Sequence, residues 1–376
     1  MQRNYNADLI KRMEENEKVE EYDGVKVLVK PIPEGGNPGD MDPRLYKSMK
    51  MMPIMSKFMP KQKKDATILE KIMPLRKMFG EYKGIEMVDS GIVTQNIIVK
   101  SADGYDVPVL IYKREKAGKN LPIMVYYHGG GFFGGGTHIV EQMCKLLVTE
   151  YDCIALNVDY RLCPENSYPA PFDDCWAATK WIYDHAKSLD GDPSKIAIGG
   201  DSAGGNLAAG IALKDRDENL GMVKLQVLLY PAVNISGKET EYYHGVDNSK
   251  YQMSKKHKRV LKCVIKMMQG MLGGGDDGNM LEELYLQGHG SADSIYVSPL
   301  LDDFHDLPAT LLMFGEHDML VFEDFAYAKS ATVKGAKIKT VVFRGLGHGF
   351  ADQIGVVPQA EEAIREIAKV MKEEFK

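Results

Sequence analysis

The sequence predicts an α/β protein in which a mostly parallel sheet carries helices on both faces. Short apolar runs alternate along the chain with longer segments whose apolar residues recur at helical spacing. This alternation implies right-handed crossovers, which place helices on both sides of a parallel sheet. A third observation is the glycine-flanked turn at Ser202, where an apolar run gives way to a helix-forming segment.

The expected sheet begins with an antiparallel pair formed by residues 97–99 and 107–112. Further strands are expected where short apolar runs recur, at residues 123–127, 154–158, 196–199, 227–230, 311–314 and 341–343. Amphipathic segments between them, such as residues 176–186 and 325–333, are expected to be helices.

Two segments interrupt this alternation, and methionine is concentrated in them. Of the 22 methionines, 16 lie within residues 1–90 or 232–296. We expect residues 1–90 to be an N-terminal helical cap segment and residues 232–296 a second cap insertion. Residues 91–231 and 297–376 would form the α/β domain, and the glycine-rich stretch 273–278 a flexible loop.

The second insertion contains an expected amphipathic helix. Its apolar positions recur at helical spacing: Val260, Leu261, Val264, Ile265 and Met268. Its other side is basic: Lys255, Lys256, Lys258, Arg259 and Lys262. We interpret the basic residues as a solvated helix face, with docking on a lipid surface or an acidic partner as the alternative. The cap methionines are interpreted as gap-filling core, with an adaptable acyl pocket as the alternative.

Composition and charge argue against several functional classes. The net charge of −6 provides no overall basic field that would favour nucleic acid. The first residues are polar and charged, and no apolar run approaches the ~20 residues of a membrane span, so we expect neither a secretory signal nor stable membrane insertion. Five cysteines without a C-x-x-C pair favour reduced thiols in the cytoplasm over disulfides or a zinc site.

Ser202 is the candidate nucleophile. It lies in Gly200-Asp201-Ser202-Ala203-Gly204, at the turn from an apolar strand into a helix. A glycine-flanked helix start in an unrelated protein is the alternative interpretation, because the five-residue pattern alone is weak. A serine hydroxyl also needs a base within hydrogen-bond reach before it becomes a good nucleophile near pH 7.

His348 and Asp318 are the candidate partners of Ser202. His348 follows the last expected strand, and no apolar periodicity explains it. Asp318 follows the preceding strand and would hold the imidazole in the required tautomer. Glu316 and Asp324 lie close to Asp318 and remain alternatives for the acidic residue. His138, His257 and His289 are interpreted as ordinary histidines, because no pair of them has metal-ligand spacing with neighbouring carboxylates.

The stretch His128-Gly129-Gly130-Gly131 follows the strand expected at 123–127. Its backbone amides are not obstructed by side chains, and with the Ala203 amide they could stabilise the negative charge that develops when a carbonyl is attacked. A phosphate-binding loop is the alternative, but the lysine and spacing of a P-loop are missing.

Together, these motifs resemble the hormone-sensitive-lipase-like family of α/β-hydrolase carboxylesterases. The stretches that carry the resemblance occur in the family's order, at residues 128–131, 160–165, 200–205, 297–300, 315–318 and 348–350. The resemblance covers about residues 92–231 and 295–376. It implies these site residues: Ser202, Asp318 and His348 as a catalytic triad, Gly130, Gly131 and Ala203 as an oxyanion hole, and His128 and Gly129 as its supporting loop.

The resemblance implies an α/β-hydrolase fold with a helical cap and a cytoplasmic serine carboxylic-ester hydrolase that works through an acyl-enzyme. No metal or organic cofactor is implied. The expected substrate is a small acyl ester of short to medium chain length, because a cap over the site limits length. Amide hydrolysis or acyl transfer by the same residues is one alternative. A non-catalytic ligand-binding protein is another, although such members typically lack the catalytic histidine. A homodimer is the assembly that the resemblance suggests.

Overall fold

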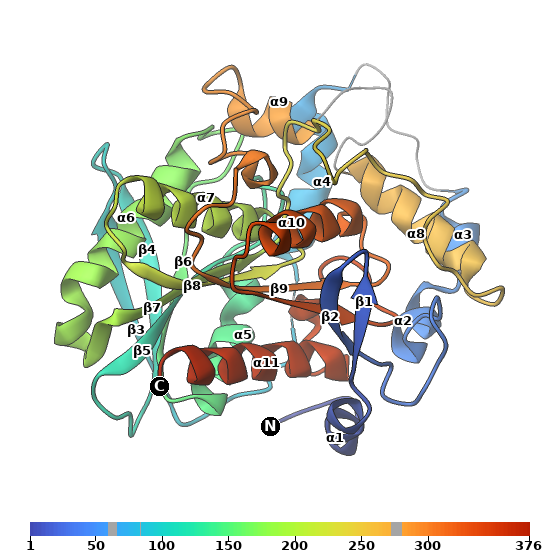
Figure 1. Ribbon diagram of the computed structural model, residues 1–376, viewed down its shortest axis with the longest axis horizontal. Coiled ribbons are helices and arrows are strands. Elements are labelled where there is room, and N and C mark those ends of the chain that lie inside the picture. The colour runs from blue at the N-terminus through green and yellow to red at the C-terminus, as the bar shows by residue number, and fades with distance from the viewer. Residues whose placement is uncertain (59–65, 83, 272–279) are drawn as a thin grey trace.

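The computed structural model describes residues 1–58, 66–82, 84–271 and 280–376. Within these residues, a ten-stranded sheet with the order β1-β2-β10-β9-β8-β7-β5-β6-β4-β3 crosses the molecule (Figure 1). Its strands are β1 (Lys18–Tyr22), β2 (Val25–Lys30), β3 (Ile92–Lys100), β4 (Asp106–Arg114), β5 (Leu121–Tyr127), β6 (Ile154–Val158), β7 (Gly191–Asp201), β8 (Val223–Leu229), β9 (Ala309–Gly315) and β10 (Ile338–Phe343).

The strands from β2 to β6 in this order are parallel, and the edges of the sheet are antiparallel. Val125 of β5, for example, lies between Leu156 of β6 and Ile198 of β7. β4 pairs antiparallel with both β6 and β3. Every residue of β5 and β6 is buried, which explains their near-continuous apolar sequences. The expected mostly parallel sheet and its antiparallel β3–β4 pair are therefore confirmed.

Helices cover both faces of the sheet (Figure 1). α5 (Thr137–Glu150) and α11 (Pro358–Glu374) pack together on one face. The other face carries α6 (Ala170–His185), α7 (Ala203–Asp217) and α10 (Val321–Val333). The helices expected at 176–186 and 325–333 correspond to α6 and α10.

The N-terminal 90 residues differ from the helical segment expected there. Residues 18–30 form the hairpin β1–β2, and β2 extends the parallel sheet with Val27 opposite Thr340 of β10. Val25, Val27 and Val29 are buried while Lys26 is exposed, which is the period-two pattern of a half-buried strand. The prediction of a helical cap segment is therefore wrong for residues 18–30.

The remaining N-terminal helices are α1 (Asp8–Glu15), α2 (Pro43–Met49), α3 (Met52–Met55) and α4 (Ile68–Gly80). The second insertion contributes α8 (Lys258–Met271) and α9 (Met280–Leu286). α8 packs against α2 and α3, although these helices are far apart in the sequence (Figure 1). The expected glycine-rich loop at 273–278 lies outside the described residues.

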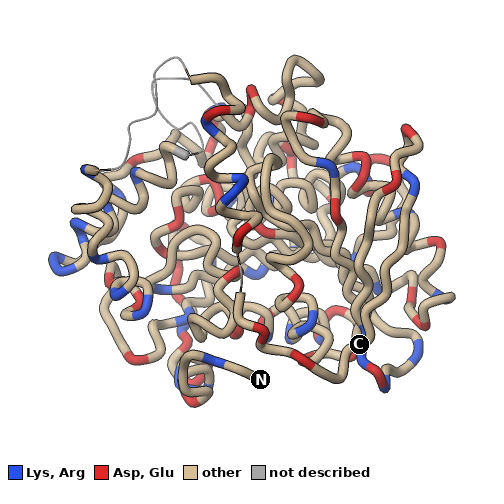
Figure 2. Tube along the Cα trace, turned by 180° about the vertical axis from the view of Figure 1, so that it is seen from behind, with Lys and Arg blue, Asp and Glu red and all other residues tan. Residues whose placement is uncertain are grey.

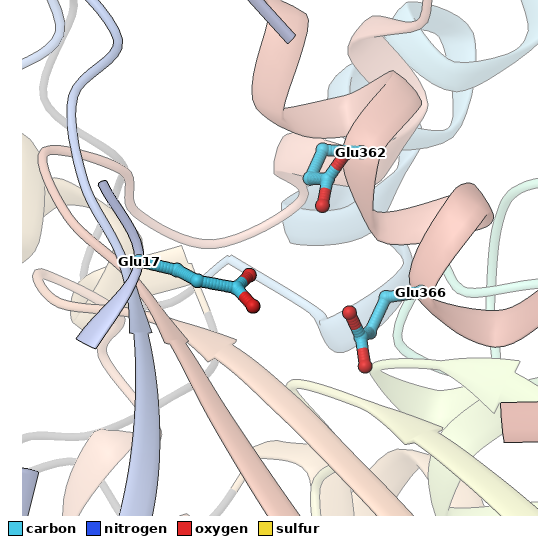
Figure 3. Close-up of side chains that lie close together, drawn as sticks. All are labelled: Glu17, Glu362 and Glu366. Atoms are coloured by element: carbon cyan, nitrogen blue, oxygen red, sulfur yellow. The ribbon is translucent and has the colours of Figure 1, made fainter. Parts of the chain in front are cut away.

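Three glutamates lie close together between the chain just before β1 and helix α11 (Figure 3). The three carboxylates of Glu17, Glu362 and Glu366 come close enough together to hold a metal ion. The ammonium group of Lys30 lies among them, with Nζ 2.7 Å from Glu362 Oε1 and 3.1 Å from Glu366 Oε2, and it also contacts Glu17. Burial raises the pKa of Glu362 to about 7, although the charge of Lys30 opposes that shift. Lys339 also pairs with Glu366, so we interpret the cluster as an internal ion group whose cations are lysines.

The five cysteines are free thiols. Cys144, Cys153, Cys163 and Cys175 are buried, and burial raises the pKa of Cys163 to about 12, so reactive thiolate is scarce there. No helix among the described residues has both the length and the apolar character needed to cross a bilayer.

Candidate active site

Ser202 occupies the sharp turn between β7 and α7. Its φ of 53° and ψ of −116° lie in a region that L-amino acids rarely adopt, and such strain is typical of functional turns. A side chain at Gly204 would place its Cβ 2.0 Å from the carbonyl oxygen of Tyr127. Only glycine fits this close approach between the turn and β5, which explains why the sequence places it there.

The structure brings Ser202, His348 and Asp318 together from loops at the carboxyl ends of three strands. His348 Nε2 lies 2.8 Å from Ser202 Oγ. His348 Nδ1 lies 2.9 Å from Asp318 Oδ1 and 3.1 Å from Oδ2. The Asp318 side chain is fully buried and that of His348 is 9% exposed. This chain of contacts lets a base withdraw the serine proton while the carboxylate stabilises the resulting imidazolium.

Asp318 is further held by the backbone and by the second insertion. Its Oδ1 accepts a hydrogen bond from the N–H of Leu320 (2.9 Å). Its backbone carbonyl accepts one from the hydroxyl of Tyr251, at 2.8 Å. The insertion therefore contacts the loop that orients the histidine.

The two alternatives to Asp318 have other surroundings. Glu316 pairs with Arg344 at 2.8 Å and accepts the backbone N–H of Gly39. Asp324 is fully buried, and neither of its carboxyl oxygens has a hydrogen-bond partner within the described residues. Burial raises the pKa of Asp324 well above its ordinary value, and the charges of Asp318 and Glu323 raise it further. The surroundings of Asp324 therefore disfavour its charged form.

The glycine loop after β5 presents unpaired amides. Gly130 has a φ of 119°, and a Cβ there would lie 2.2 Å from the carbonyl oxygen of Gly134, so the loop is compact at this point. Among the turn and loop hydrogen bonds of the described residues, none is donated by the backbone N–H of Gly130, Gly131 or Ala203. Ala203 is the first residue of α7, where helical N–H groups are free and the helix dipole is positive.

His128 and Gly129 hold this loop in place. The His128 ring stacks on Tyr160 at 4.3 Å, and the Tyr160 hydroxyl donates to the His128 carbonyl oxygen at 2.6 Å. The Gly129 N–H donates to Asp201 Oδ1 at 2.9 Å. Burial lowers the pKa of His128 to about 4, so its ring is neutral near pH 7. His128 is thus suited to positioning the loop rather than to transferring protons.

Two buried carboxyl groups near the loop were not predicted as site residues. Burial raises the pKa of Asp201 to about 6. Burial raises the pKa of Asp352 well above its ordinary value, and the charge of Asp201 raises it further. Asp201 also accepts a hydrogen bond from the Tyr126 hydroxyl at 3.2 Å. Asp201 could have been predicted as a site residue, because it lies directly before Ser202 in the serine motif. No sequence pattern distinguishes Asp352.

Arg76 of α4 ties the cap to the glycine loop and was also missed. Its Nε donates to the carbonyl oxygen of Phe133 at 2.7 Å, and its Nη1 lies 2.6 Å from Glu165 Oε1. In the same 160–165 stretch, the guanidinium group of Arg161 donates two hydrogen bonds, of 2.8 and 2.7 Å, to the carboxylate of Asp174. These contacts indicate a structural role for that stretch.

An apolar cavity of about 70 Å³ lies beside His348, between α2 and α8. The cap side of its lining includes Leu45, Met49, Leu261, Val264, Ile265 and Met268. The methionines can repack around apolar groups of varied shape. The arrangement therefore places an apolar binding space directly against the proton-transfer group.

Comparison with known proteins agrees with this geometry. A family model described as an alpha/beta hydrolase fold matches residues 124–352. The carboxylesterase NlhH of Mycobacterium tuberculosis is 32% identical over 260 residues, which span 69% of this chain and 75% of the relative. An arylesterase of Saccharolobus solfataricus is 27% identical over 285 residues, which span 75% of this chain and 84% of the relative. The structure of a hyperthermophilic esterase from Pyrobaculum calidifontis superposes with a TM-score of 0.69 at 28% identity, covering 89% of this chain and 98% of that chain.

Proposed function

The chain belongs to the alpha/beta hydrolase fold family, among carboxylesterases of the hormone-sensitive-lipase-like type, and from this membership we propose that Ser202, His348 and Asp318 hydrolyse carboxylic esters through an acyl-enzyme. The protein is a carboxylesterase-type hydrolase. The continuous contact from Ser202 Oγ through His348 to Asp318 is the observation that carries the residue assignment.

In the first step, Ser202 Oγ attacks the ester carbonyl carbon while His348 Nε2 takes its proton. Asp318 stabilises the imidazolium, and the oxygen that becomes negative accepts hydrogen bonds from the amides of Gly130, Gly131 and Ala203. The attack gives a tetrahedral intermediate. Its collapse breaks the bond between the carbonyl carbon and the alcohol oxygen, and His348 protonates the departing alcohol. Ser202 is left as an acyl ester.

In the second step, His348 takes a proton from a water molecule that attacks the acyl carbonyl. The same amides stabilise the second oxyanion, and His348 returns the proton to Ser202 Oγ as the carboxylic acid leaves. Every proton transfer in this scheme uses His348. Its orientation, which is held by hydrogen bonds to Asp318 and Ser202, therefore matters in both steps.

Short to medium acyl esters are the substrates that the site favours. The cavity beside His348 is small and apolar, and it is closed on the cap side by α2 and α8. A series of p-nitrophenyl esters from acetate to palmitate tests this preference. Maximal kcat/KM at acetate or butyrate is expected, and a maximum at palmitate would overturn it.

Replacement of Ser202 by Ala tests the nucleophile directly. We expect kcat/KM for p-nitrophenyl butyrate to fall by about 10⁴-fold or more, because the acyl-enzyme can no longer form. Ser90→Ala, at an exposed serine, is the matched control and should retain full activity. A Ser202→Ala protein with an unchanged thermal midpoint and more than about a tenth of the activity would refute the assignment.

The cytoplasm is the compartment that we propose, and five free thiols support it. A homodimer joined through strand edges would use β1 or β3, which terminate the sheet. Sedimentation velocity of the wild-type protein tests the dimer, and a single monomeric species would contradict it.

A further inference from the structure

Positive charge is concentrated on the outer surface of the cap. Residues 43–58 and 248–271 together contain eleven Lys and Arg residues and no Asp or Glu. Removing these eleven charges from the net charge of −6 leaves −17 on the rest of the chain. The two segments are brought together where α8 packs against α2 and α3, and in Figure 2 several Lys and Arg segments follow one another along the left edge, where these helices lie.

Most of these cations are exposed and unpaired. Arg44 pairs with Asp42 and Glu34, but the other ten are exposed and have no ion-pair partner within the described residues. Those ten are Lys47, Lys50, Lys57, Lys250, Lys255, Lys256, Lys258, Arg259, Lys262 and Lys266. Elsewhere on the surface cations commonly pair with carboxylates, as Lys337 does with Glu374. Among the residues that the structure describes, the positive charge of the cap surface is therefore not neutralised by ion pairs.

The cations of α8 form one stripe along the helix. Lys258, Arg259, Lys262 and Lys266 recur at intervals of three or four residues and share a face. The opposite face holds the residues that line the cavity beside His348, including Leu261 and Met268. α8 thus separates the apolar cavity from a cationic outer surface.

Exposed apolar side chains lie next to this stripe. Phe58, just after α3, is 83% exposed, and Met55 and Ile54 are 56% and 43% exposed. Cys263 Sγ of α8 lies 3.6 Å from Ser56 Oγ, so these side chains adjoin α8. We call the outer side of α8 together with residues 51–58 the basic cap face. It combines positive charge with apolar side chains that water hydrates poorly.

We propose that the basic cap face docks the protein on an anionic phospholipid surface. The lysines and arginines attract the acidic headgroups, and Phe58, Met55 and Ile54 enter the interface between headgroups and acyl chains. A nucleic acid would engage the charges but would gain little from the apolar side chains, and an acidic protein would need an apolar patch placed beside its carboxylates to match them. The presence of both features on one surface favours lipid. This inference is independent of the proposed function.

Co-sedimentation with vesicles tests the proposal, using Ser202→Ala protein so that no lipid is hydrolysed. We expect binding to phosphatidylcholine vesicles that contain phosphatidylglycerol, weak binding to pure phosphatidylcholine, and release at high salt. Replacing Lys258, Arg259, Lys262 and Lys266 together by Gln should weaken binding by about 30-fold or more. Phe58→Ser should weaken it about fivefold or more, because that side chain no longer enters the interface.

The matched control replaces four exposed cations outside this face, which are unpaired among the described residues, by Gln: Lys18, Lys26, Lys116 and Lys334. It changes the net charge equally, yet binding should stay within about twofold. When the same quadruple substitutions are made in protein that keeps Ser202, both variants should hydrolyse p-nitrophenyl butyrate as the wild type does, which shows that they fold.

No binding of the Ser202→Ala protein to anionic vesicles, or equal losses of binding in the two quadruple variants, would overturn the proposal. Retention on heparin that matches vesicle binding, with no effect of Phe58→Ser on either, would assign the surface to an acidic macromolecule instead.

Discussion

Asp318 and Asp324 lie six positions apart, are both buried, and have opposite surroundings. Asp318 accepts hydrogen bonds from His348 and from the N–H of Leu320. Asp324 accepts none within the described residues, and burial raises its pKa, which disfavours the charged form. Position in the sequence favours Asp318, which follows β9 directly, and hydrogen bonding separates the two residues.

Replacing Asp318 and Asp324 separately by Asn tests this difference through its effect on kcat. Asp318→Asn should lower kcat by about 10⁴-fold, because an amide neither stabilises the imidazolium nor selects the required tautomer. Asp324→Asn keeps the shape of a side chain whose oxygens make no hydrogen bond within the described residues, and should change kcat by about twofold or less. Esterase kinetics on both variants provide the measurement, and a larger loss at Asp324 would overturn the choice of Asp318.

Glu323 should make stability depend on pH. Burial raises its pKa to about 8 from an ordinary 4.5, and its Oε1 accepts the N–H of Val233 at 2.8 Å. Between these two pH values the folded protein holds a proton that the unfolded chain has lost. Stability contributed by this group is therefore lost as pH rises from about 4.5 to 8, by up to ~1.4 kcal/mol per pH unit.

Urea denaturation of Glu323→Gln at several pH values measures this contribution. Glutamine keeps the carbonyl acceptor but does not titrate, so its free energy of unfolding should fall less steeply between pH 5 and 8. Glu21→Gln, at an exposed strand position, is the control and should follow the wild type. Parallel profiles for wild type and Glu323→Gln would contradict the prediction.

At the scale of elements, α4 positions the glycine loop through Arg76. Its Nε holds the Phe133 carbonyl oxygen and its Nη1 lies against Glu165. Arg76→Met should lower kcat about tenfold with a smaller change in KM, because the loop amides would no longer be aligned with the developing oxyanion. Steady-state kinetics test this, with Lys77→Met on the exposed side of the same helix as the control. A change confined to KM would instead assign Arg76 to substrate binding.

Elements with a strong local pattern were predictable from the sequence. The apolar runs that become β5, β6, β8 and β9 are buried and bounded by turns, and α8 shows a clear apolar periodicity. The hairpin β1–β2 was missed because its pattern is short, lies among charged residues, and gains its partner β10 only after folding. Ser202, His348 and Asp318 were recognisable because each follows an expected strand. Arg76 and Asp352 act through contacts distant in sequence, which no local pattern encodes.

At the scale of the whole molecule, the Lys30 cluster links the N-terminal sheet edge to the C-terminal helix. Lys30→Met should destabilise the protein by about 3–5 kcal/mol, because it leaves the buried carboxyl group of Glu362 without a counter-charge, whereas Glu366 keeps its ion pair with Lys339. Urea denaturation measures the loss. Lys26→Met, at an exposed position of the same strand, is the control.

A triple variant sharpens this prediction. Combining Lys30→Met with Glu362→Gln and Glu366→Gln removes the charges together and should recover most of the lost stability. A loss below about 1 kcal/mol for Lys30→Met alone would show that the cluster contributes little.

The parallel pairing of β2 with β10 has a consequence for synthesis on the ribosome. Val27 and its partner Thr340 are 313 positions apart, so at ~5–20 residues per second β2 waits roughly 16–60 s for its neighbour β10. Throughout that interval, one edge of β2 has only solvent or another chain to pair with. The nascent N-terminus is therefore the segment most in need of chaperone protection, and the sheet closes only when the last strand has left the exit tunnel.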